Sequence, residues 1–446
     1  MAAIIENVCR VRYSSAVPHT HPLATKANRV LETNAPSVYA LLSGRGREYY
    51  FPVTGILSQG ADADGTEING SIGIALGDDL EPMRLSDIAK SIDLPPRQAF
   101  PYAGAYGIKT LREEWQASMK RKNPSMTFET SLPVVTAGLT HGLSIVGALF
   151  LEAGDHVHLP YPFWDNYAMT FETGYGAELE TFPLYEGEKF NVAGLKQALK
   201  QEKGKKILFL NFPNNPTGYA PRKNEAKEIA EAVCDIAAQG SDILVIIDDA
   251  YFGFVFEDDV YPESLFSLFG NLHERVLAVK IDGCTKEDYA WGLRVGFITF
   301  AGKGLTQAAL DVLGDKAAGV VRGTVSNASN ASQHLLLKAM RSPNYQKDKR
   351  AGFDTMHVRY QKITAILRQP KFQTHMKLLP CNAGYFLCLE LREGLDAEKI
   401  RQKLLKEYST GVIALDRFLR IAFSSVPEAP IEELCERVLK ACEDEM

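Results

Sequence analysis

The chain has 446 residues, of which 46% are hydrophobic and 23% charged, as in a folded globular protein large enough for two domains. Its formal net charge of −6 gives no general attraction to nucleic acid or to an anionic membrane, so we expect neither as a partner. Seven cysteines without a CxxC pair indicate neither disulfides nor zinc, and we expect no metal. The start has only a short apolar run and no stretch is long enough to span a membrane, so we expect a cytoplasmic protein.

The predicted elements divide the chain into three parts. Residues 1–90 are expected to form an N-terminal arm and part of a smaller domain, residues 91–310 a large domain, and residues 311–446 a C-terminal small α+β domain. Up to about residue 70 the sequence has no clear period and many turn formers, so we interpret it as an arm and loops. A short strand is expected at 72–76.

In the large domain, continuous apolar runs alternate with helical patterns. This alternation indicates a mainly parallel sheet covered by helices on both faces, whose ligands lie at the carboxyl ends of the strands. The smaller domain is expected from helices and strands in the last hundred residues. The runs lie at 133–136, 156–160, 206–212, 242–249, 275–281 and 296–300; helices are expected from about 107, at 140–152, 222–239, 329–340, 345–367 and 397–407, and from 430, with strands at 384–391 and 418–423.

Two clusters at predicted strand ends combine glycines or aromatic residues. The segment TAGLTHG (136–142) leaves a strand and starts a helix, where backbone N–H groups and the Thr140 hydroxyl can hold a phosphate. A packing role for its glycines is an equal alternative. In LPYPFWDNY (159–167), Trp164 can lie flat on a planar ring, although an aromatic residue at this position is otherwise part of the core.

Two further clusters carry amide and carboxyl groups. NFPNNPTGY (211–219) makes a rigid turn that can aim an asparagine side chain inward, or simply a surface turn. In DDAYFGF (248–254), Asp248 follows an apolar strand and therefore needs a cationic partner or several donors. A protonated ring nitrogen would serve, and Tyr251 adds a phenol within reach of the same ligand.

The stretch IDGCTKEDYAWGLRVG (281–296) places Lys286 after a turn-like Asp282-Gly283 and Arg294 between two glycines. A lysine becomes a catalyst when it can be neutral, and a nearby fixed cation favours the neutral form while also holding an anion. The alternative from these residues alone is a solvated charged loop, because Glu287 and Asp288 follow the lysine.

The order and spacing of these clusters resemble the class I/II aminotransferases, which are pyridoxal-phosphate-dependent enzymes of fold type I. The resemblance covers about residues 73–423 and depends on NNPTG, then DDAY, then a lysine eight residues before an arginine. It implies pyridoxal 5'-phosphate as cofactor, bound in the large domain. It also implies transfer of an amino group between an α-amino acid and a 2-oxo acid by a ping-pong mechanism.

The resemblance implies roles for individual residues around the cofactor ring. Lys286 matches the lysine that joins the cofactor as an imine and later moves the Cα proton. Asp248 matches the carboxylate that keeps the pyridine nitrogen protonated, which makes the ring an electron sink. Tyr251 and Asn215 match the partners of the ring's phenolic oxygen, and Trp164 matches the stacking aromatic residue.

The phosphate and substrate sides follow in the same way. Arg420, in FLRIAF (418–423), resembles the arginine that clamps the substrate α-carboxylate, beside Asn215 and Trp164; the alternative is a surface arginine at a strand end. Tyr102 matches a tyrosine that reaches the phosphate of the neighbouring subunit, which implies a homodimer with shared active sites. The residues that match the phosphate cup are Gly138, Leu139, Thr140 and Arg294.

Two positions depart from the family pattern. Many relatives have serine where this chain has Gly283, so one phosphate hydrogen bond is expected to be missing and Gly283→Ser is expected to tighten cofactor binding. Relatives also often have glycine near Asp79, which leaves the substrate-side geometry open.

Other functions remain open at this point. A C–S lyase, a decarboxylase or an acyl-transferring synthase can use the same fold and cofactor, although Trp164 counts against the synthases, which tend to stack a histidine. A regulator with an aminotransferase-like domain would need a basic DNA-binding module near its start, and the first seventy residues do not resemble one.

Overall fold

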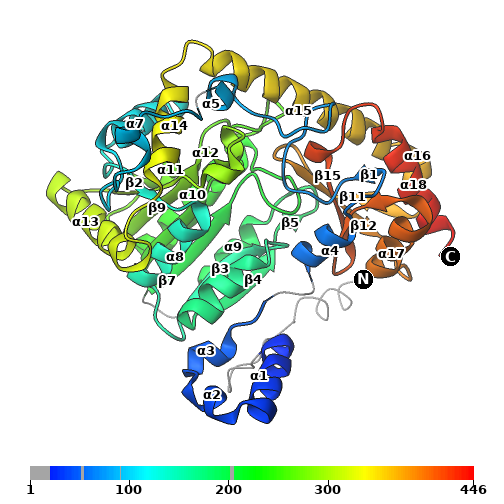
Figure 1. Ribbon diagram of the computed structural model, residues 1–446, viewed down its shortest axis with the longest axis horizontal. Coiled ribbons are helices and arrows are strands. Elements are labelled where there is room, and N and C mark those ends of the chain that lie inside the picture. The colour runs from blue at the N-terminus through cyan, green and yellow to red at the C-terminus, as the bar shows by residue number, and fades with distance from the viewer. Residues whose placement is uncertain (1–20, 52–54, 91, 201–204, 446) are drawn as a thin grey trace.

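The computed structural model describes residues 21–51, 55–90, 92–200 and 205–445. Its centre is a seven-stranded sheet in the order β2-β10-β9-β8-β7-β3-β4 (Figure 1). All neighbouring pairs are parallel except those of β10, which runs antiparallel to β2 and β9, so the predicted mainly parallel sheet is confirmed. The strands span Val134–Thr136 (β2), His156–Tyr161 (β3), Glu178–Pro183 (β4), Lys205–Asn211 (β7), Asp242–Asp248 (β8), Val276–Gly283 (β9) and Gly296–Gly302 (β10).

Helices cover both faces of this sheet because its strands are apolar on both sides. On β7, Ile207 and Phe209 join the core that contains α8, whereas Leu208 and Leu210 join the core that contains α10. This alternation follows from the two-residue period of an extended strand. The helices of this part are α7 (Lys109–Lys122), α8 (Leu139–Phe150), α9 (Val192–Leu199), α10 (Lys223–Ala238), α11 (Phe266–Phe269), α13 (Gln307–Thr324) and α14 (Asn330–Met340).

A second, antiparallel sheet has the order β11-β12-β15-β14 and packs with the C-terminal helices. The short strand β1 (Ile68–Asn69) pairs in parallel with β13 (Thr410–Gly411), which ties the N-terminal part of the chain to this unit. The elements span Tyr345–Leu367 (α15), Pro370–Gln373 (α16), Met376–Leu378 (β11), Phe386–Leu391 (β12), Ala397–Tyr408 (α17), Ile413–Leu415 (β14), Phe418–Ala422 (β15) and Ile431–Glu443 (α18).

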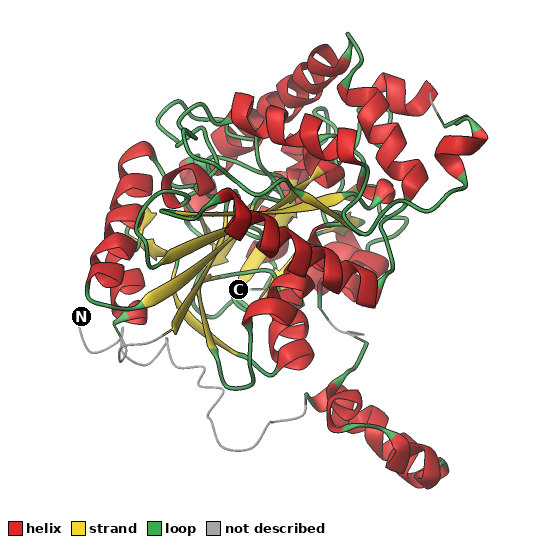
Figure 2. Cartoon of the chain, turned by 90° about the vertical axis from the view of Figure 1, so that its left-hand side faces the viewer, coloured by secondary structure: helices red, strands yellow, loops and turns green. Residues whose placement is uncertain are grey.

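The segment before β1 is largely helical, so the loops expected there are a wrong prediction; residues 1–20 lie outside the described part. Its helices are α1 (Pro22–Asn34), α2 (Pro36–Leu41), α3 (Gly44–Glu48) and α4 (Ile56–Asp62). Proline near the first position of α1 and α2 favours these starts, because it needs no helical N–H bond there. Helices α1–α3 stand away from the rest of the chain (Figures 1 and 2). The strand expected at 72–76 is also absent, and only an isolated bridge joins Leu76 to Pro82.

The division of the chain at residues 90 and 310 stays a prediction. Helices α13 and α14 contact α8 and α7, which belong to the larger sheet, and this favours a later boundary near the start of α15. Across the described ranges, the longest apolar helices fall short of what crossing a membrane requires.

Candidate active site

The carboxyl ends of the parallel strands bring the predicted clusters together at one edge of the larger sheet. Asp248 is the last residue of β8, and the short helix α12 (Cys284–Glu287), which carries Lys286, follows β9 directly. Because β8 and β9 are parallel neighbours, their carboxyl ends lie side by side. The turn that contains Asn215 follows β7, the next strand in the sheet.

Asp248 is buried and held in a fixed orientation. Its Oδ2 accepts a hydrogen bond of 2.7 Å from the Tyr167 hydroxyl, and its Oδ1 accepts one of 3.1 Å from the backbone N–H of Ala250. Burial raises the pKa of Asp248, while the Tyr167 hydrogen bond and the charge of Lys286 oppose that rise. A further cation at this carboxylate would therefore be strongly favoured, because it would relieve the cost of burying the negative charge.

Lys286 lies in an environment that favours its neutral form. Its Nζ is 4.9 Å from the centre of the Tyr251 ring. Burial lowers the pKa of Lys286 to about 8; attraction to Asp248 opposes the shift, and the charge of Arg294 adds to it. The neutral form of this amine is thus far more populated near neutral pH than in an ordinary lysine, which favours a nucleophilic role.

The solvated charged loop considered for this stretch is wrong. Glu287 and Asp288 are buried, and Lys286 is half-buried. The expected turn at Asp282-Gly283 is wrong as well, because β9 continues to pair with β10 as far as Gly283. Strand β9 therefore places Lys286 three residues beyond its last residue, Gly283, at the carboxyl end of the strand.

The start of α8 forms a corner whose geometry suits an anion. Gly138 caps the helix with a positive φ of 83°, and Leu139 and Thr140 are the next residues. A Cβ at Gly138 would lie 2.5 Å from Arg294 Nη2, so the guanidinium rests directly against the backbone of this turn. The free N–H groups of a helix start together with a guanidinium suit a phosphate. His141, which the sequence did not single out, orders the turn by accepting a 3.0 Å hydrogen bond from the Ala137 N–H.

The structure contradicts the expected benefit of Gly283→Ser. A Cβ at Gly283 would lie 2.6 Å from the Val295 carbonyl oxygen and 2.8 Å from the Gly296 Cα, both of them backbone atoms that a paired strand holds in place. We therefore expect Gly283→Ser to weaken cofactor retention and to destabilise the fold by about 1–3 kcal/mol, as overpacking does. Equilibrium dialysis and denaturant unfolding measure both effects. A tighter cofactor with unchanged unfolding would restore the original expectation.

Arg420 lies at the meeting point of the two sheets. It is 2% exposed, so the alternative of a surface arginine is wrong. Its Nη1 donates to Asn215 Oδ1 at 3.2 Å and its Nη2 to the Ser71 carbonyl at 3.0 Å, while the guanidinium lies 4.4 Å from the centre of the Phe386 ring. Its buried Nε has no hydrogen-bond partner among the described residues. The structure thus brings Asn215 and Arg420 together and leaves donor capacity on the arginine.

The remaining predicted residues lie in different settings. Trp164 is half-buried and meets Tyr167 edge to face, with ring centres 5.5 Å apart. Tyr102 is 90% exposed and therefore lies away from the buried cluster within this chain. The Asp79 carboxylate accepts a 3.1 Å hydrogen bond from the Glu81 N–H, so it stabilises its own turn.

The sequence did not point to Tyr167 or Ser71. Tyr167 follows Trp164 by three residues in the same aromatic segment, and that short spacing is the signal that could have found it. Ser71 contributes a backbone carbonyl, which any residue can supply, so its identity carries no signal.

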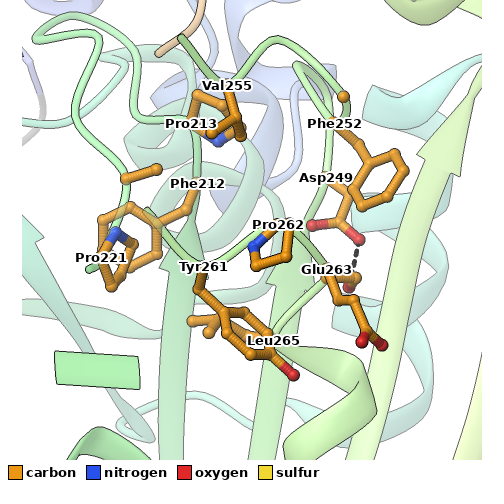
Figure 3. A pocket seen from close by; sticks show the side chains of 13 residues that line it. Phe212, Pro213, Pro221, Asp249, Phe252, Val255, Tyr261, Pro262, Glu263 and Leu265 are labelled. Atoms are coloured by element: carbon orange, nitrogen blue, oxygen red, sulfur yellow. Dashed lines mark hydrogen bonds between the residues drawn. The ribbon is translucent and has the colours of Figure 1, made fainter. Parts of the chain in front are cut away.

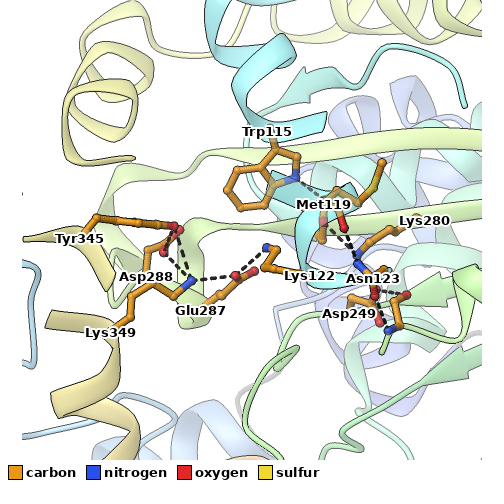
Figure 4. A network of polar contacts seen from close by, with 12 residues as sticks. Trp115, Met119, Lys122, Asn123, Asp249, Lys280, Glu287, Asp288, Tyr345 and Lys349 are labelled. Carbon is orange, nitrogen blue, oxygen red and sulfur yellow. Dashed lines mark hydrogen bonds and ion pairs between the residues drawn. The ribbon is translucent and has the colours of Figure 1, made fainter. Parts of the chain in front are cut away.

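Buried ion pairs fix the turn that carries the lysine (Figure 4). Glu287 Oε1 accepts hydrogen bonds from Lys122 Nζ at 2.6 Å and from Lys349 Nζ at 2.7 Å. Lys349 Nζ also lies 3.0 Å from Asp288 Oδ1, which accepts a 2.7 Å hydrogen bond from Tyr345. Burial works to raise the pKa of Glu287, but the two lysines lower it to about 2. Helices α7 and α15 are thereby joined to α12.

Breaking this network should cost stability. We expect Lys349→Met to lower the free energy of unfolding by about 3–5 kcal/mol, because it leaves two buried carboxylates short of a cation. The neighbouring Arg350→Met is the control: Arg350 pairs with Asp354 on the surface, where an ion pair contributes less than about 1 kcal/mol. Denaturant titration compares the two, and equal unfolding midpoints would show that the network does not stabilise the fold.

A second buried group surrounds Lys280, which pairs with Asp249 and lies 2.8 Å from Asp282 Oδ2. The cavity beside Asp249 (Figure 3) has a volume of about 20 Å³, room for a water molecule but not for an amino acid. No group of three or more histidine, cysteine, aspartate or glutamate side chains suited to a metal ion occurs in the described ranges.

The geometry fits pyridoxal phosphate on two independent observations. The backbone of Gly138 and the guanidinium of Arg294 leave no space for a side chain between them and form an anion cradle. Asp248 is a buried carboxylate that a ring cation would satisfy, and its charge is close enough to Lys286 to act on the amine. The Gly138–Arg294 cradle would suit the phosphate, Asp248 the protonated ring nitrogen and Lys286 the aldehyde.

The family model for aminotransferase class I and II matches residues 76–438. The chain therefore belongs to this family of pyridoxal-phosphate-dependent aminotransferases. It is similar to the aspartate aminotransferase of Pyrococcus abyssi, with 25% identity over 384 residues that cover 83% of this chain and 90% of the relative. It is also similar to aromatic-amino-acid aminotransferase 2 of Thermococcus litoralis, with 24% identity over 393 residues, 86% of this chain and 94% of the relative.

Solved structures confirm the fold. An aminotransferase from Anaerococcus prevotii superimposes with a TM-score of 0.80 at 21% identity, covering 90% of this chain and 99% of the other. The Pyrococcus horikoshii kynurenine aminotransferase, solved in complex with PMP, gives a TM-score of 0.76 at 17% identity and covers 92% and 98%. Fold type I, with its large domain and smaller α+β unit, is thus the architecture of this chain.

Proposed function

We propose that the protein transfers an amino group between an α-amino acid and a 2-oxo acid in two half-reactions, with pyridoxal 5'-phosphate as its cofactor. The observation that carries the proposal is a half-buried lysine, with its pKa lowered to about 8, beside a buried aspartate and near the cradle of Arg294 and Gly138. When bound, the cofactor supplies an electrophilic carbonyl carbon and an electron-accepting ring.

The chain's own residues then have distinct tasks. Asp248, oriented by Tyr167, would hold the proton on the ring nitrogen, and Trp164 would cover the ring face. Burial raises the pKa of Tyr251, so its phenol stays protonated and can donate to the ring oxygen together with Asn215. The residues proposed to hold the phosphate are Gly138, Leu139, Thr140 and Arg294.

Lys286 and Arg420 would act on the substrate. The guanidinium of Arg420 has unused donor capacity for an α-carboxylate, and a two-pronged contact fixes the orientation of Cα. Lys286, once free as an amine, would take the Cα proton and return it, because its lowered pKa suits proton transfer near neutral pH.

The test is a panel of α-amino acids added to the purified holoenzyme, with cofactor absorbance and released products followed together. We expect conversion of the cofactor to its amine form with one equivalent of 2-oxo acid, and reversal on adding a 2-oxo acid. Release of carbon dioxide or of a thiol would instead identify a decarboxylase or a C–S lyase. No reaction with any amino acid would contradict the proposal.

The lysine gives a pH dependence that checks its environment. Only the neutral amine attacks an aldehyde, so the rate at which cofactor-free protein captures pyridoxal phosphate should rise with pH and level off above the Lys286 pKa of about 8. Stopped-flow absorbance across this range gives the midpoint. A midpoint near the ordinary lysine value of about 10.4 would show that the amine is not buried as described.

We also propose that the active unit is a homodimer in which Tyr102 serves the neighbouring site. Its side chain is 90% exposed and Phe100 beside it is 84% exposed, which is unusual for aromatic residues that do not meet a partner. Tyr102→Ala should weaken cofactor binding by about tenfold, the loss of one hydrogen bond to a charged group. Sedimentation of the wild type and cofactor titration of both proteins test this, and a fully active monomer would contradict it.

A further inference from the structure

The substrate side of the site contains a carboxylate to which no role has been assigned. Asp165 directly follows Trp164 and is exposed. Its Oδ2 lies 3.3 Å from where a Cβ of Gly55 would be, and the backbone of Ile56 stabilises the carboxylate by a hydrogen bond. Asp165 therefore faces the start of α4 across the site.

Contacts around α4 place this carboxylate near Arg420. The Gln59 side chain of α4 makes two hydrogen bonds with the backbone of Ala414 in β14, at 2.7 and 3.0 Å. In the same strand, Ile413 is paired with Arg420 of β15. On the other side, the Tyr161 hydroxyl donates a 3.0 Å hydrogen bond to Asp416 at the turn between β14 and β15. The segment carrying Asp165 and the strand carrying Arg420 thus enclose one space.

A bound substrate would leave the negative charge of Asp165 without a compensating positive charge. Arg420 and Asp165 attract each other electrostatically, although the ion pairs of the described residues do not include these two. The other charged groups near this space already have partners. Asp416 accepts a hydrogen bond from Tyr161, and Arg417 forms an ion pair with Glu390 at 2.8 Å. An α-carboxylate on Arg420 would neutralise the arginine and leave Asp165 as a negative charge facing the rest of the substrate.

We propose that Asp165 is a specificity-determining residue that disfavours amino acids with a second carboxylate and favours those with neutral or cationic side chains. This inference rests on the proposed function of the site and adds the substrate class to it. A second carboxylate beside Asp165 meets like-charge repulsion, whereas a side-chain amide or ammonium can donate to it. The chain would then differ from its relatives named aspartate aminotransferases in its preferred donor.

Half-reaction kinetics with L-glutamine and L-glutamate test the proposal, because the two substrates differ in charge but hardly in shape. Wild-type holoenzyme should favour glutamine, and Asp165→Asn should reduce the ratio of the two kcat/KM values by about tenfold. Asp79→Asn is the matched control: its carboxylate is bonded to its own turn, so the ratio should not change.

Calorimetry adds a readout that needs no reaction. Glutarate and pentanoate have the same five-carbon chain, and Asp165→Asn should tighten glutarate binding about tenfold while leaving pentanoate unchanged. A wild type that prefers glutamate, or a variant in which neither ratio moves, would overturn the role of Asp165 alone. Failure of every amino acid to convert the cofactor would instead overturn the proposed function and this inference with it.

Discussion

Replacing Lys286 by alanine should reduce the rate of the first half-reaction by four orders of magnitude or more, counting on the order of 10⁴-fold for the lost proton transfer alone. The covalent bond to the cofactor is lost at the same time, so the change removes two functions of one amine. Single-turnover kinetics with the best donor from the amino acid panel measure the effect.

The Lys286→Arg variant distinguishes these two functions from the effect of a positive charge at this position. Arginine keeps a cation near Asp248 but does not lose its proton at accessible pH, so it can neither attack the cofactor nor accept a proton from Cα. We expect the arginine variant to be as inactive as the alanine variant. An arginine variant with substantial activity would show that Lys286 contributes only its charge.

Arg420→Ala should lower kcat/KM by about 100-fold or more for every α-amino acid, because charge-assisted hydrogen bonds contribute about 1.5–3 kcal/mol each. The guanidinium is buried and already oriented by Asn215 and the Ser71 carbonyl, so little ordering is needed when a carboxylate binds. Half-reaction kinetics with one good donor give the ratio of wild type to variant.

The conservative change tests geometry as well as charge. Arg420→Lys should recover only part of the loss, since an ammonium cannot make the planar two-pronged contact. Cofactor absorbance should be unchanged in both variants, because Arg420 is assigned to the substrate. A lysine variant equal to wild type, or an alanine variant that loses the cofactor, would refute this assignment.

The sequence predicted the larger sheet well because its strands are apolar on both faces. Continuous runs such as 242–249 are recognisable without any knowledge of their partners, and β8 lies within one residue of the expected bounds. β4 was missed because it lies at the edge of the sheet, where most of its residues are exposed or half-buried and form no continuous apolar run. The N-terminal helices were missed because this part of the chain is rich in turn formers and is mostly exposed: α1 buries only Ala24 and α2 buries none of its residues.

The candidate site was predictable where a side chain's chemistry marks it. Lys286, Asp248 and Arg294 stand out because burying a charged side chain costs free energy unless it has a partner, and such residues are often found at functional sites. The sequence does not show how closely other strands approach a residue's backbone. The clash that forbids a side chain at Gly283 comes from Val295 and Gly296, which lie further along the chain. The sequence likewise offered no reason to select Asp165, because its position near Arg420 depends on the tertiary contacts of α4 and β14.

The most direct test is reduction of the holoenzyme with borohydride, followed by proteolysis and identification of the peptide that carries the cofactor. The lysine with the lowered pKa beside Asp248 should be the attachment point, so the label should be found on Lys286. Label on another lysine, or protein that releases all of its cofactor after reduction, would contradict the central claim.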